Sequence, residues 1–375
     1  MFLTKIKNIY YICIMKQKKV ILSVTNNLET DQRVHKVASS LHENGFDVLV
    51  VGTKSRKCNP YKRNYDTKRM PCLFKKGFLF YAEYNIRLFF LLLFADCDIL
   101  TANDTDSLAP NFIVAKIRRK KLVVDLHELF PEVPEVVSRP FVKKVWESIE
   151  AAILPRVSHG YTVCESIANY YKERYGTDLN VVRNIPMRRH FCKKSEKLKF
   201  DGKKIILYQG AVNVGRGIEW IMEAMPMVEN AVFVVIGRGD LFDELSKKAE
   251  EEIYQDKVFF LGHVPYSELF EYTCSADLGT CLLEANGLSY YFSLPNRIFD
   301  YMQAHVPIIA TDFPEIRKVV STYKTGRVTN SKDPKVLAKI ITEMLNEKID
   351  DNIFENALAN FSWEKEAETL IKIYK

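Results

Sequence analysis

A glycine-rich loop in the second half of the chain joins a predicted strand to a predicted helix and is suited to holding phosphate. The loop covers residues 208–217 and contains Gly210, Gly215 and Arg216. Glycines let the backbone approach a ligand closely, and free amides at the start of a helix attract phosphate. Arg216 adds a fixed positive charge with bidentate geometry. We therefore predict a phosphate site here; the alternative is an ordinary loop with a solvated arginine.

A second candidate segment begins another predicted helix in the same half. Ser293 and Pro295 mark a helix start. Arg297 lies near this end and can face a diphosphate, and Asp300 lies about one turn in, where it can accept hydrogen bonds from a ribose diol. A capped helix with a surface ion pair is the alternative. The predicted binding residues of this segment are Ser293, Leu294, Pro295, Asn296, Arg297 and Asp300.

A third candidate segment, Gly-Arg-Gly-Asp at 237–240, follows a predicted strand. Gly237 and Arg238 can touch a nucleotide there, or the segment can simply turn the chain. It is not a dinucleotide fingerprint, because the third glycine and the downstream acidic residue are missing.

Polar residues of the first half collect at the edge where reacting groups gather in such sheets. Asp125, His127 and Glu128 follow a predicted strand, and Asp31 and Arg33 begin the first helix. An imidazole can handle a proton or hold a sugar hydroxyl. The alternatives are a structural histidine, a plain N-cap for Asp31 and a surface charge for Arg33.

The elements that must position these residues alternate between strand and helix. Residues 20–24 and 47–51 are short apolar runs typical of buried parallel strands, and Val34, Val37 and Leu41 form an apolar helical stripe between them. Further strands are predicted at 98–101, 122–125, 160–163, 204–208, 231–236, 258–261, 278–283 and 307–311, with helices at 108–118, 140–155, 165–175, 241–251, 267–273 and 296–304.

This alternation predicts an α/β protein with two Rossmann-like, doubly wound parallel sheets facing a cleft. Ligands of such sheets bind beyond the carboxyl ends of the strands. A chain of 375 residues is long enough for two domains. The irregular, basic stretch 181–203 puts the boundary near 193–202, so we predict an N-terminal domain over 18–195 and a C-terminal domain over 196–358.

The N-terminal residues 1–17 are expected to be an unstructured extension. Their apolar run, Ile9–Met15, is broken by two tyrosines and no small-residue cleavage site follows, unlike a signal peptide. Met15 is a second candidate start. The other apolar run, Leu88–Ala95, is far shorter than the roughly 20 residues that span a bilayer.

Composition narrows the class of partner. The net charge of +7 comes from 54 Lys and Arg against 47 Asp and Glu, and the basic residues are spread along the chain. No aromatic–basic binding motif occurs, so we do not expect a nucleic-acid partner. An anionic partner fits better, either a sugar nucleotide or an acidic membrane surface. The eight cysteines form no CxxC pair and no metal spacing, which favours the reducing cytoplasm.

Basic and aromatic residues over 74–95, among them Lys75, Lys76, Phe78 and Phe90, are able to rest on a membrane surface. A core helix is the alternative for this stretch. We expect a cytoplasmic protein, with peripheral contact at the inner membrane face as the accompanying hypothesis.

Taken together, these segments resemble the family 4 glycosyltransferases, which are retaining enzymes of the GT-B fold. The resemblance covers about residues 18–375 and is strongest over 258–316. The final segment, 359–375, resembles the family's terminal helix that crosses back to the N-domain. The matching stretches are 31–34, 210–217, 260–264, 293–302, 306–312 and 361–374.

The resemblance implies roles for these residues. Arg216 stands where the family holds the donor diphosphate, and Asp300 stands where the second Glu of an E-x7-E motif binds the ribose. The backbone around His263 and Val264 is expected to meet the base, and the loop 286–296 to wrap the donor sugar and phosphates. The expected acceptor-side residues are Asp31, Arg33, Asp125 and Glu128, with His127 among the catalytic residues.

The sequence departs from the family pattern at four places. Phe292 replaces the first Glu of E-x7-E, so that contact to the donor sugar is absent. Ala211 replaces a second basic residue, for which Arg297 can substitute. His305 replaces the usual Gly before Val-Pro, which is tolerable because His visits left-handed backbone more than most residues. The first loop, Asn26–Thr30, lacks glycine.

The resulting hypothesis is a glycosyltransferase that moves a hexose-type sugar from a UDP- or GDP-linked donor to an acceptor hydroxyl with retention. Arg216 and Arg297 neutralise the leaving diphosphate. No Asp cluster for a divalent ion is evident, so neither a metal nor another cofactor is expected. The acceptor is expected to be a glycan or lipid-linked precursor. The alternatives are a nucleotide-sugar epimerase of the same fold and a non-catalytic subunit that keeps the fold.

Overall fold

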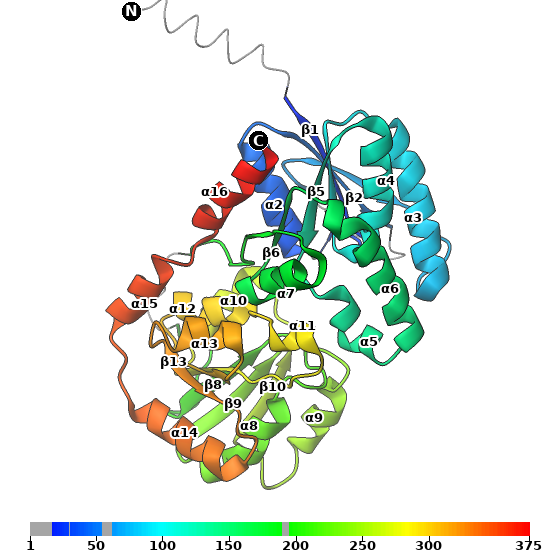
Figure 1. Ribbon diagram of the computed structural model, residues 1–375. Helices are drawn as coiled ribbons and strands as arrows, with labels where there is room; N and C mark the ends of the chain where they lie inside the picture. Colours follow the sequence, from blue (N-terminus) through cyan, green and yellow to red (C-terminus); the bar gives the residue numbers. More distant parts are fainter. Residues whose placement is uncertain (1–16, 30, 55–61, 190–194) are drawn as a thin grey trace, which may run out of the picture.

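A computed structural model describes residues 17–29, 31–54, 62–189 and 195–375 of the protein, and it contains two parallel sheets (Figure 1). The N-terminal sheet has seven strands in the order β3-β2-β1-β4-β5-β6-β7, and the C-terminal sheet has six in the order β10-β9-β8-β11-β12-β13. Every neighbouring pair is parallel. The predicted fold of two doubly wound parallel sheets is confirmed.

The strands of the two sheets have the following bounds: β1 Lys19–Ser23, β2 Asp47–Thr53, β3 Asp66–Met70, β4 Ile99–Asn103, β5 Lys121–Leu126, β6 Gly160–Thr162, β7 Asn180–Val181, β8 Lys204–Gln209, β9 Ala231–Ile236, β10 Val258–Gly262, β11 Leu278–Cys281, β12 Ile308–Thr311 and β13 Gly326–Thr329. The sequence analysis did not predict β3, β7 or β13. Each of the three lies at an edge of its sheet. They are short or only partly buried, so the apolar pattern in their sequences is weak.

Helices cover both faces of the N-terminal sheet. On one face, α2 (Gln32–Glu43) packs through its predicted apolar stripe of Val34, Val37 and Leu41. The other face is covered by α3 (Gly77–Phe94), α4 (Leu108–Arg118), α6 (Pro140–Ile153) and α7 (Glu165–Tyr175), with the short helix α5 (Pro134–Val137) leading into α6.

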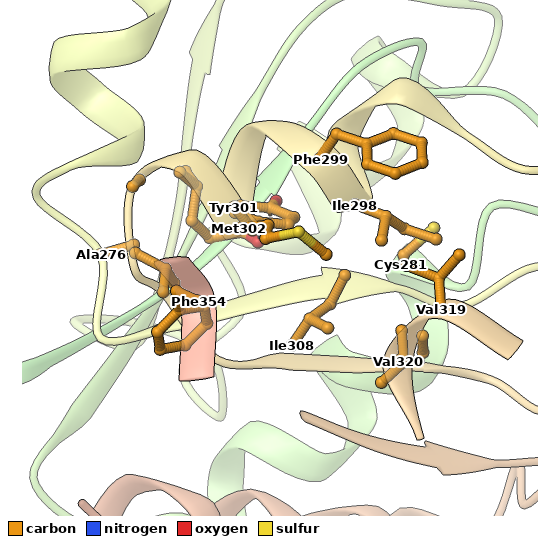
Figure 2. Close-up of a cluster of buried hydrophobic side chains, with 14 of the residues drawn as sticks. Ala276, Cys281, Ile298, Phe299, Tyr301, Met302, Ile308, Val319, Val320 and Phe354 are labelled. Carbon is orange, nitrogen blue, oxygen red and sulfur yellow. Dashed lines mark hydrogen bonds between the residues drawn. The ribbon is translucent and has the colours of Figure 1, made fainter. Parts of the chain in front are cut away.

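The C-terminal sheet is also covered on both faces. On one side lie α8 (Ile218–Ala224), α9 (Phe242–Lys248) and α14 (Pro334–Asn346). On the other lie α10 (Tyr266–Thr273), α12 (Asn296–Gln303), α13 (Pro314–Val320) and α15 (Asp351–Leu358). The short helix α11 (Leu288–Tyr291) precedes α12. Figure 2 shows how Ile298, Phe299, Tyr301 and Met302 of α12 reach this core, which fixes the helix in position.

The last helix, α16 (Trp363–Tyr374), returns to the N-terminal sheet and packs beside α2 (Figure 1). Trp363 donates its indole N–H to Ser40 Oγ at 2.9 Å, and the Tyr374 hydroxyl lies 3.0 Å from Thr101 Oγ1. The chain therefore crosses between the two halves twice. The numerical domain bounds stay a prediction, and residues 1–16 and 190–194 lie outside the described residues.

The backbone at His305 has φ +53°, the left-handed conformation that its place before Val-Pro predicted. The imidazole is held by Asp351 and Glu355 of α15, at 2.9 and 3.1 Å, and stacks on Phe354. These side-chain contacts offset the backbone cost of the left-handed conformation at His305.

Candidate active site

A cavity of about 440 Å³ opens at the carboxyl ends of strands from both sheets. On the N-terminal side its lining follows β5, β6 and β7, and on the C-terminal side it follows β8 and includes the start of α12. The lining residues are His127, Glu128, Val163, Ile167, Asn184, Gln209, Gly210, Arg216, Leu269, Ser289, Tyr290, Ser293, Leu294, Pro295, Asn296, Arg297 and Asp300.

The start of α12 points into this cavity. Pro295 is the N-cap and no side chain caps the helix, so the amides of its first turn have no side-chain partner. Unpaired amides at a helix N-terminus favour negative charge. Pro295, Asn296 and Arg297 all line the cavity. The helix start and the cavity therefore combine into a site suited to an anion.

Arg297 is clamped beneath the glycine-rich loop. Its side chain is only 9% exposed, and its guanidinium carbon lies 4.5 Å from the centre of the Tyr208 ring. A Cβ atom added at Gly210 would lie 3.3 Å from Arg297 Nη2, so the glycine lets the loop lie close over the guanidinium. Arg297 Nη1 forms no hydrogen bond with any described residue. The charge is held in place with one donor unused.

Arg216 approaches the same cavity from the other end of the loop. Its Nη2 donates to the Tyr290 hydroxyl at 3.1 Å, and its guanidinium carbon lies 4.9 Å from that ring's centre. Its Nε has no hydrogen-bond partner within the described part of the chain. Tyr290 of α11 lies within the loop 286–296 that the family resemblance expected to wrap the donor, but it was not singled out, since nothing in its sequence context distinguishes it from a core tyrosine.

Asp300 lines the cavity one turn into α12 and accepts a hydrogen bond from Gln209 Nε2 at 3.2 Å. The side-chain oxygen of Gln209, Oε1, in turn accepts a hydrogen bond from Thr273 Oγ1 at 2.7 Å, which fixes the orientation of the side-chain amide. Burial raises the pKa of Asp300 to about 6. The carboxylate is therefore ionised at neutral pH but close to its titration range. Gln209 is a second residue that the sequence did not predict.

The predicted residues Gly215, Gly237, Arg238, His263 and Val264 are not among those that line the cavity. Gly237 has a packing role instead: a Cβ atom there would lie 1.8 Å from the carbonyl oxygen of Gly210. The guanidinium of Arg238 stacks on the Phe242 ring at 4.4 Å. The segment 237–240 thus supports the glycine-rich loop from behind, and the predicted contacts of these residues with the nucleotide stay untested predictions.

His127 is held as a cation on the N-terminal wall. Its Nε2 lies 2.9 Å from Asp104 Oδ2, and its Nδ1 lies 3.9 Å from Asp125 Oδ1. Burial by itself lowers the pKa of His127, but Asp104 and then Asp125 raise it to about 10. The imidazolium places a positive charge on this wall, and at neutral pH it cannot accept a proton. Asp104, after β4, was not predicted.

Arg33 and Asp125 were predicted to line the acceptor side, but they form a buried ion pair and do not line the cavity. Arg33 Nη2 lies 2.6 Å from Asp125 Oδ1, and the side chains are 4% and 0% exposed. Arg33 also donates to the carbonyl oxygen of Val182 at 3.3 Å. The alternative of a surface charge for Arg33 is wrong, because each charge needs the other once both are buried. Asp31 caps α2 by accepting the Val34 N–H at 2.9 Å and does not line the cavity either.

Phe292, which stands where the family pattern has a carboxylate, packs partly buried against the core of the N-terminal half. Its carbonyl oxygen accepts a hydrogen bond from Cys164 Sγ at 3.3 Å. The residue therefore joins the two halves, and it is not among the cavity lining. Across residues 17–29, 31–54, 62–189 and 195–375, no group of three or more His, Cys, Asp and Glu side chains could hold a metal ion; metal independence stays a prediction.

Comparison with known proteins agrees with this geometry. Residues 31–186 match the model of Glycosyltransferase Family 4, and residues 192–369 match that of Glycosyl transferases group 1. The chitobiosyldiphosphodolichol beta-mannosyltransferase of Candida albicans is 24% identical over 281 residues, which are 66% of this chain and 60% of that enzyme. Other curated relatives are matched over about half of their length or less.

Two solved structures show the same fold over nearly the whole chain. Sucrose-phosphate synthase from Thermosynechococcus elongatus has a TM-score of 0.78 at 17% identity, covering 96% of this chain and 98% of the synthase. Anabaena HepE in complex with UDP has a TM-score of 0.73 at 14% identity, covering 95% and 99%. From the two family models and the paired parallel sheets, we conclude that the chain belongs to the family 4, group 1 glycosyltransferases of the GT-B fold.

Proposed function

We propose that the chain transfers a hexose-type sugar from a UDP- or GDP-linked donor to an acceptor hydroxyl with retention. The observation that carries the proposal is the convergence of Arg216, Arg297 and the uncapped start of α12 on one wall of the cavity, with Asp300 beside them. Two fixed guanidinium groups and a helix N-terminus suit a diphosphate, and a carboxylate suits a ribose diol.

In the proposed reaction, the bond between the anomeric carbon and the diphosphate oxygen breaks while a bond to the acceptor oxygen forms on the same face. The acceptor proton passes to an oxygen of the leaving diphosphate. Arg216 and Arg297 stabilise the negative charge that develops on this leaving group, which is the kind of contribution that usually dominates catalysis. His127, protonated at neutral pH, contributes a positive charge from the opposite wall.

The acceptor is proposed to be a lipid-linked or surface-glycan precursor. The Candida relative is named for a substrate in which a sugar is joined to dolichol through a diphosphate, and one solved neighbour is described as involved in lipopolysaccharide biosynthesis. A lipid-linked acceptor requires the enzyme to meet a membrane surface, so peripheral contact belongs to the same proposal.

Helix α3 supports that contact. By length and composition it could cross a membrane, but it connects β3 to β4 of one sheet and packs against α4. Only Tyr84, Leu88 and Leu92 of its side chains are buried, so the core-helix alternative does not describe its outer side. That side is apolar and exposed, with Leu79, Ile86, Phe90 and Phe94 between 53% and 81% exposed.

A donor panel tests the function. A ligand bound to the native state at 100 times its Kd adds about 2.7 kcal/mol of stability, so one UDP- or GDP-sugar should raise the melting temperature and the others should not. Nuclear magnetic resonance of the product should show the donor's anomeric configuration. Consumption of the donor with no acceptor present would favour the epimerase, and no binding by any donor would favour a non-catalytic subunit. Sedimentation with anionic liposomes at low and high salt tests the membrane contact.

A further inference from the structure

An apolar groove of about 530 Å³ lies on the N-terminal half between α3 and α6, which run beside each other in Figure 1. Its floor is the buried ring of Trp146, which meets Tyr81 and Phe130 edge to face at 5.2 and 5.0 Å between ring centres. Phe78 and Phe141 also line it and are 79% and 81% exposed. Exposed aromatic rings of this size around a groove mark a binding site more often than a plain surface.

Two uncharged polar side chains of the groove are already occupied. Asn85 Nδ2 donates to the carbonyl oxygens of Tyr81 and Asp106 at 2.8 and 3.0 Å. Thr105 Oγ1 donates to Glu150 Oε1 at 2.6 Å. These donors are satisfied inside the protein, so the groove offers little to a sugar or a peptide backbone. A hydrocarbon chain has no polar groups, so it gives up no hydrogen bonds to water when it enters the groove.

One chain segment, residues 127–130, lines both the groove and the active-site cavity. His127 and Glu128 line the cavity, and Phe130 of the same segment lines the groove. Asp104 accepts the backbone N–H of His127 at 2.9 Å, and the next residue, Thr105, lines the groove. The groove therefore shares the segment 127–130 with the N-terminal wall of the cavity, the wall on which the acceptor is expected.

A cationic side chain, Arg139, is among the residues that line the groove. It has no acidic partner among the described residues, whereas Lys143 is paired with Glu132. An apolar groove with an unpaired cation in its lining complements an amphiphile whose head is a phosphate.

We propose that this groove holds the hydrocarbon chain of a lipid phosphate that carries the acceptor sugar, with the phosphate at Arg139 and the sugar directed toward His127 and Glu128. The inference rests on the proposed function and adds the acceptor's chemical class and its binding site. The exposed face of α3 contacts the membrane from which the lipid is drawn.

Farnesyl phosphate, below the concentration at which it aggregates, is a suitable ligand for the test. The fluorescence of Trp146 reports its binding to the full chain in the absence of any donor. Ala82→Phe puts a ring into the groove and should weaken binding about tenfold or more; the matched control Ile86→Phe puts the same ring on the outer face and should not. Arg139→Gln should weaken farnesyl phosphate but leave farnesol unchanged.

A donor-induced rise in melting temperature reports, for each variant, that the fold and the C-terminal site are intact. Equal binding by wild type and Ala82→Phe would overturn the proposal. So would a change from dimer to monomer in Ala82→Phe on sedimentation, because the groove would then be an interface between two copies. Failure of every nucleotide sugar to bind would overturn the proposed function alone, since the lipid is measured without donor.

Discussion

The two walls of the active-site cavity use charge in opposite ways. On the C-terminal wall, the charged residues Arg216, Arg297 and Asp300 all line the cavity. On the N-terminal wall, Arg33 and Asp125 satisfy each other below the surface. The first wall keeps its charge available for a ligand, whereas the second uses most of its charge to hold its own shape.

The outer surfaces of the two halves also differ, in how their exposed apolar side chains are distributed. On the N-terminal half, large exposed apolar side chains gather on α3, α4 and the segment around α6, as at Phe90, Ile117 and Phe141. On the C-terminal half they are scattered, as at Met227 and Val336. A nucleotide sugar is small, charged and soluble, so one half needs only a precise anion site. The proposed acceptor is amphiphilic, so the other half needs an apolar surface and a stable scaffold.

The largest expected effect tests whether the N-terminal charges are structural. Arg33→Met leaves Asp125 buried without its partner and should lower the free energy of unfolding by about 3–5 kcal/mol. Arg33→Met/Asp125→Leu should lose less than the two single variants added together. Urea unfolding measures these values, with the exposed Arg327→Met as the control at about 0–1 kcal/mol. A loss in Arg33→Met no larger than in the control would contradict the structural role.

The next effect tests whether the C-terminal charges act on the ligand. Arg216→Ala should lower kcat/KM by about 10²–10³-fold, the range seen when one group that stabilises a developing negative charge is removed. Its free energy of unfolding should barely change, because the side chain's one hydrogen bond is to Tyr290. Steady-state kinetics give the first value and urea unfolding the second. Arg317→Ala removes an exposed arginine as the control, and equal rates in the two variants would remove Arg216 from the mechanism.

The smallest effect concerns pH. Burial raises the pKa of Asp300 to about 6 in the free protein. The hydroxyl groups of a ribose donate hydrogen bonds more strongly to an ionised carboxylate than to a protonated one. The sugar nucleotide should therefore bind tightly at pH values above 6. Below pH 6 its affinity should fall, by up to about tenfold per pH unit. Donor KM measured from pH 5 to 8 should show this rise, and Asp300→Asn should be weaker and independent of pH. A wild-type KM that stays constant down to pH 5 would exclude the contact.

The sequence alone determined the sheet strands with strong apolar runs, the glycine-rich loop and the helix that carries Arg297 and Asp300, because these features depend on local periodicity and backbone freedom. It also anticipated the left-handed backbone of His305. It could not settle α3, whose apolar residues lie on all sides, so that its pattern fits a core helix and a surface helix equally.

Only the tertiary structure decided which polar groups stay available. Arg33 and Asp125 are 92 positions apart, and the burial that pairs them results from packing between α2 and β5. The same holds for Asp104 beneath His127, for Gln209 beside Asp300 and for Phe292 between the two halves. The residue type sets the chemistry that a side chain can perform. Its partners and its burial depend on contacts with residues distant in the sequence. These contacts determine whether the side chain is available to a ligand or is paired within the protein.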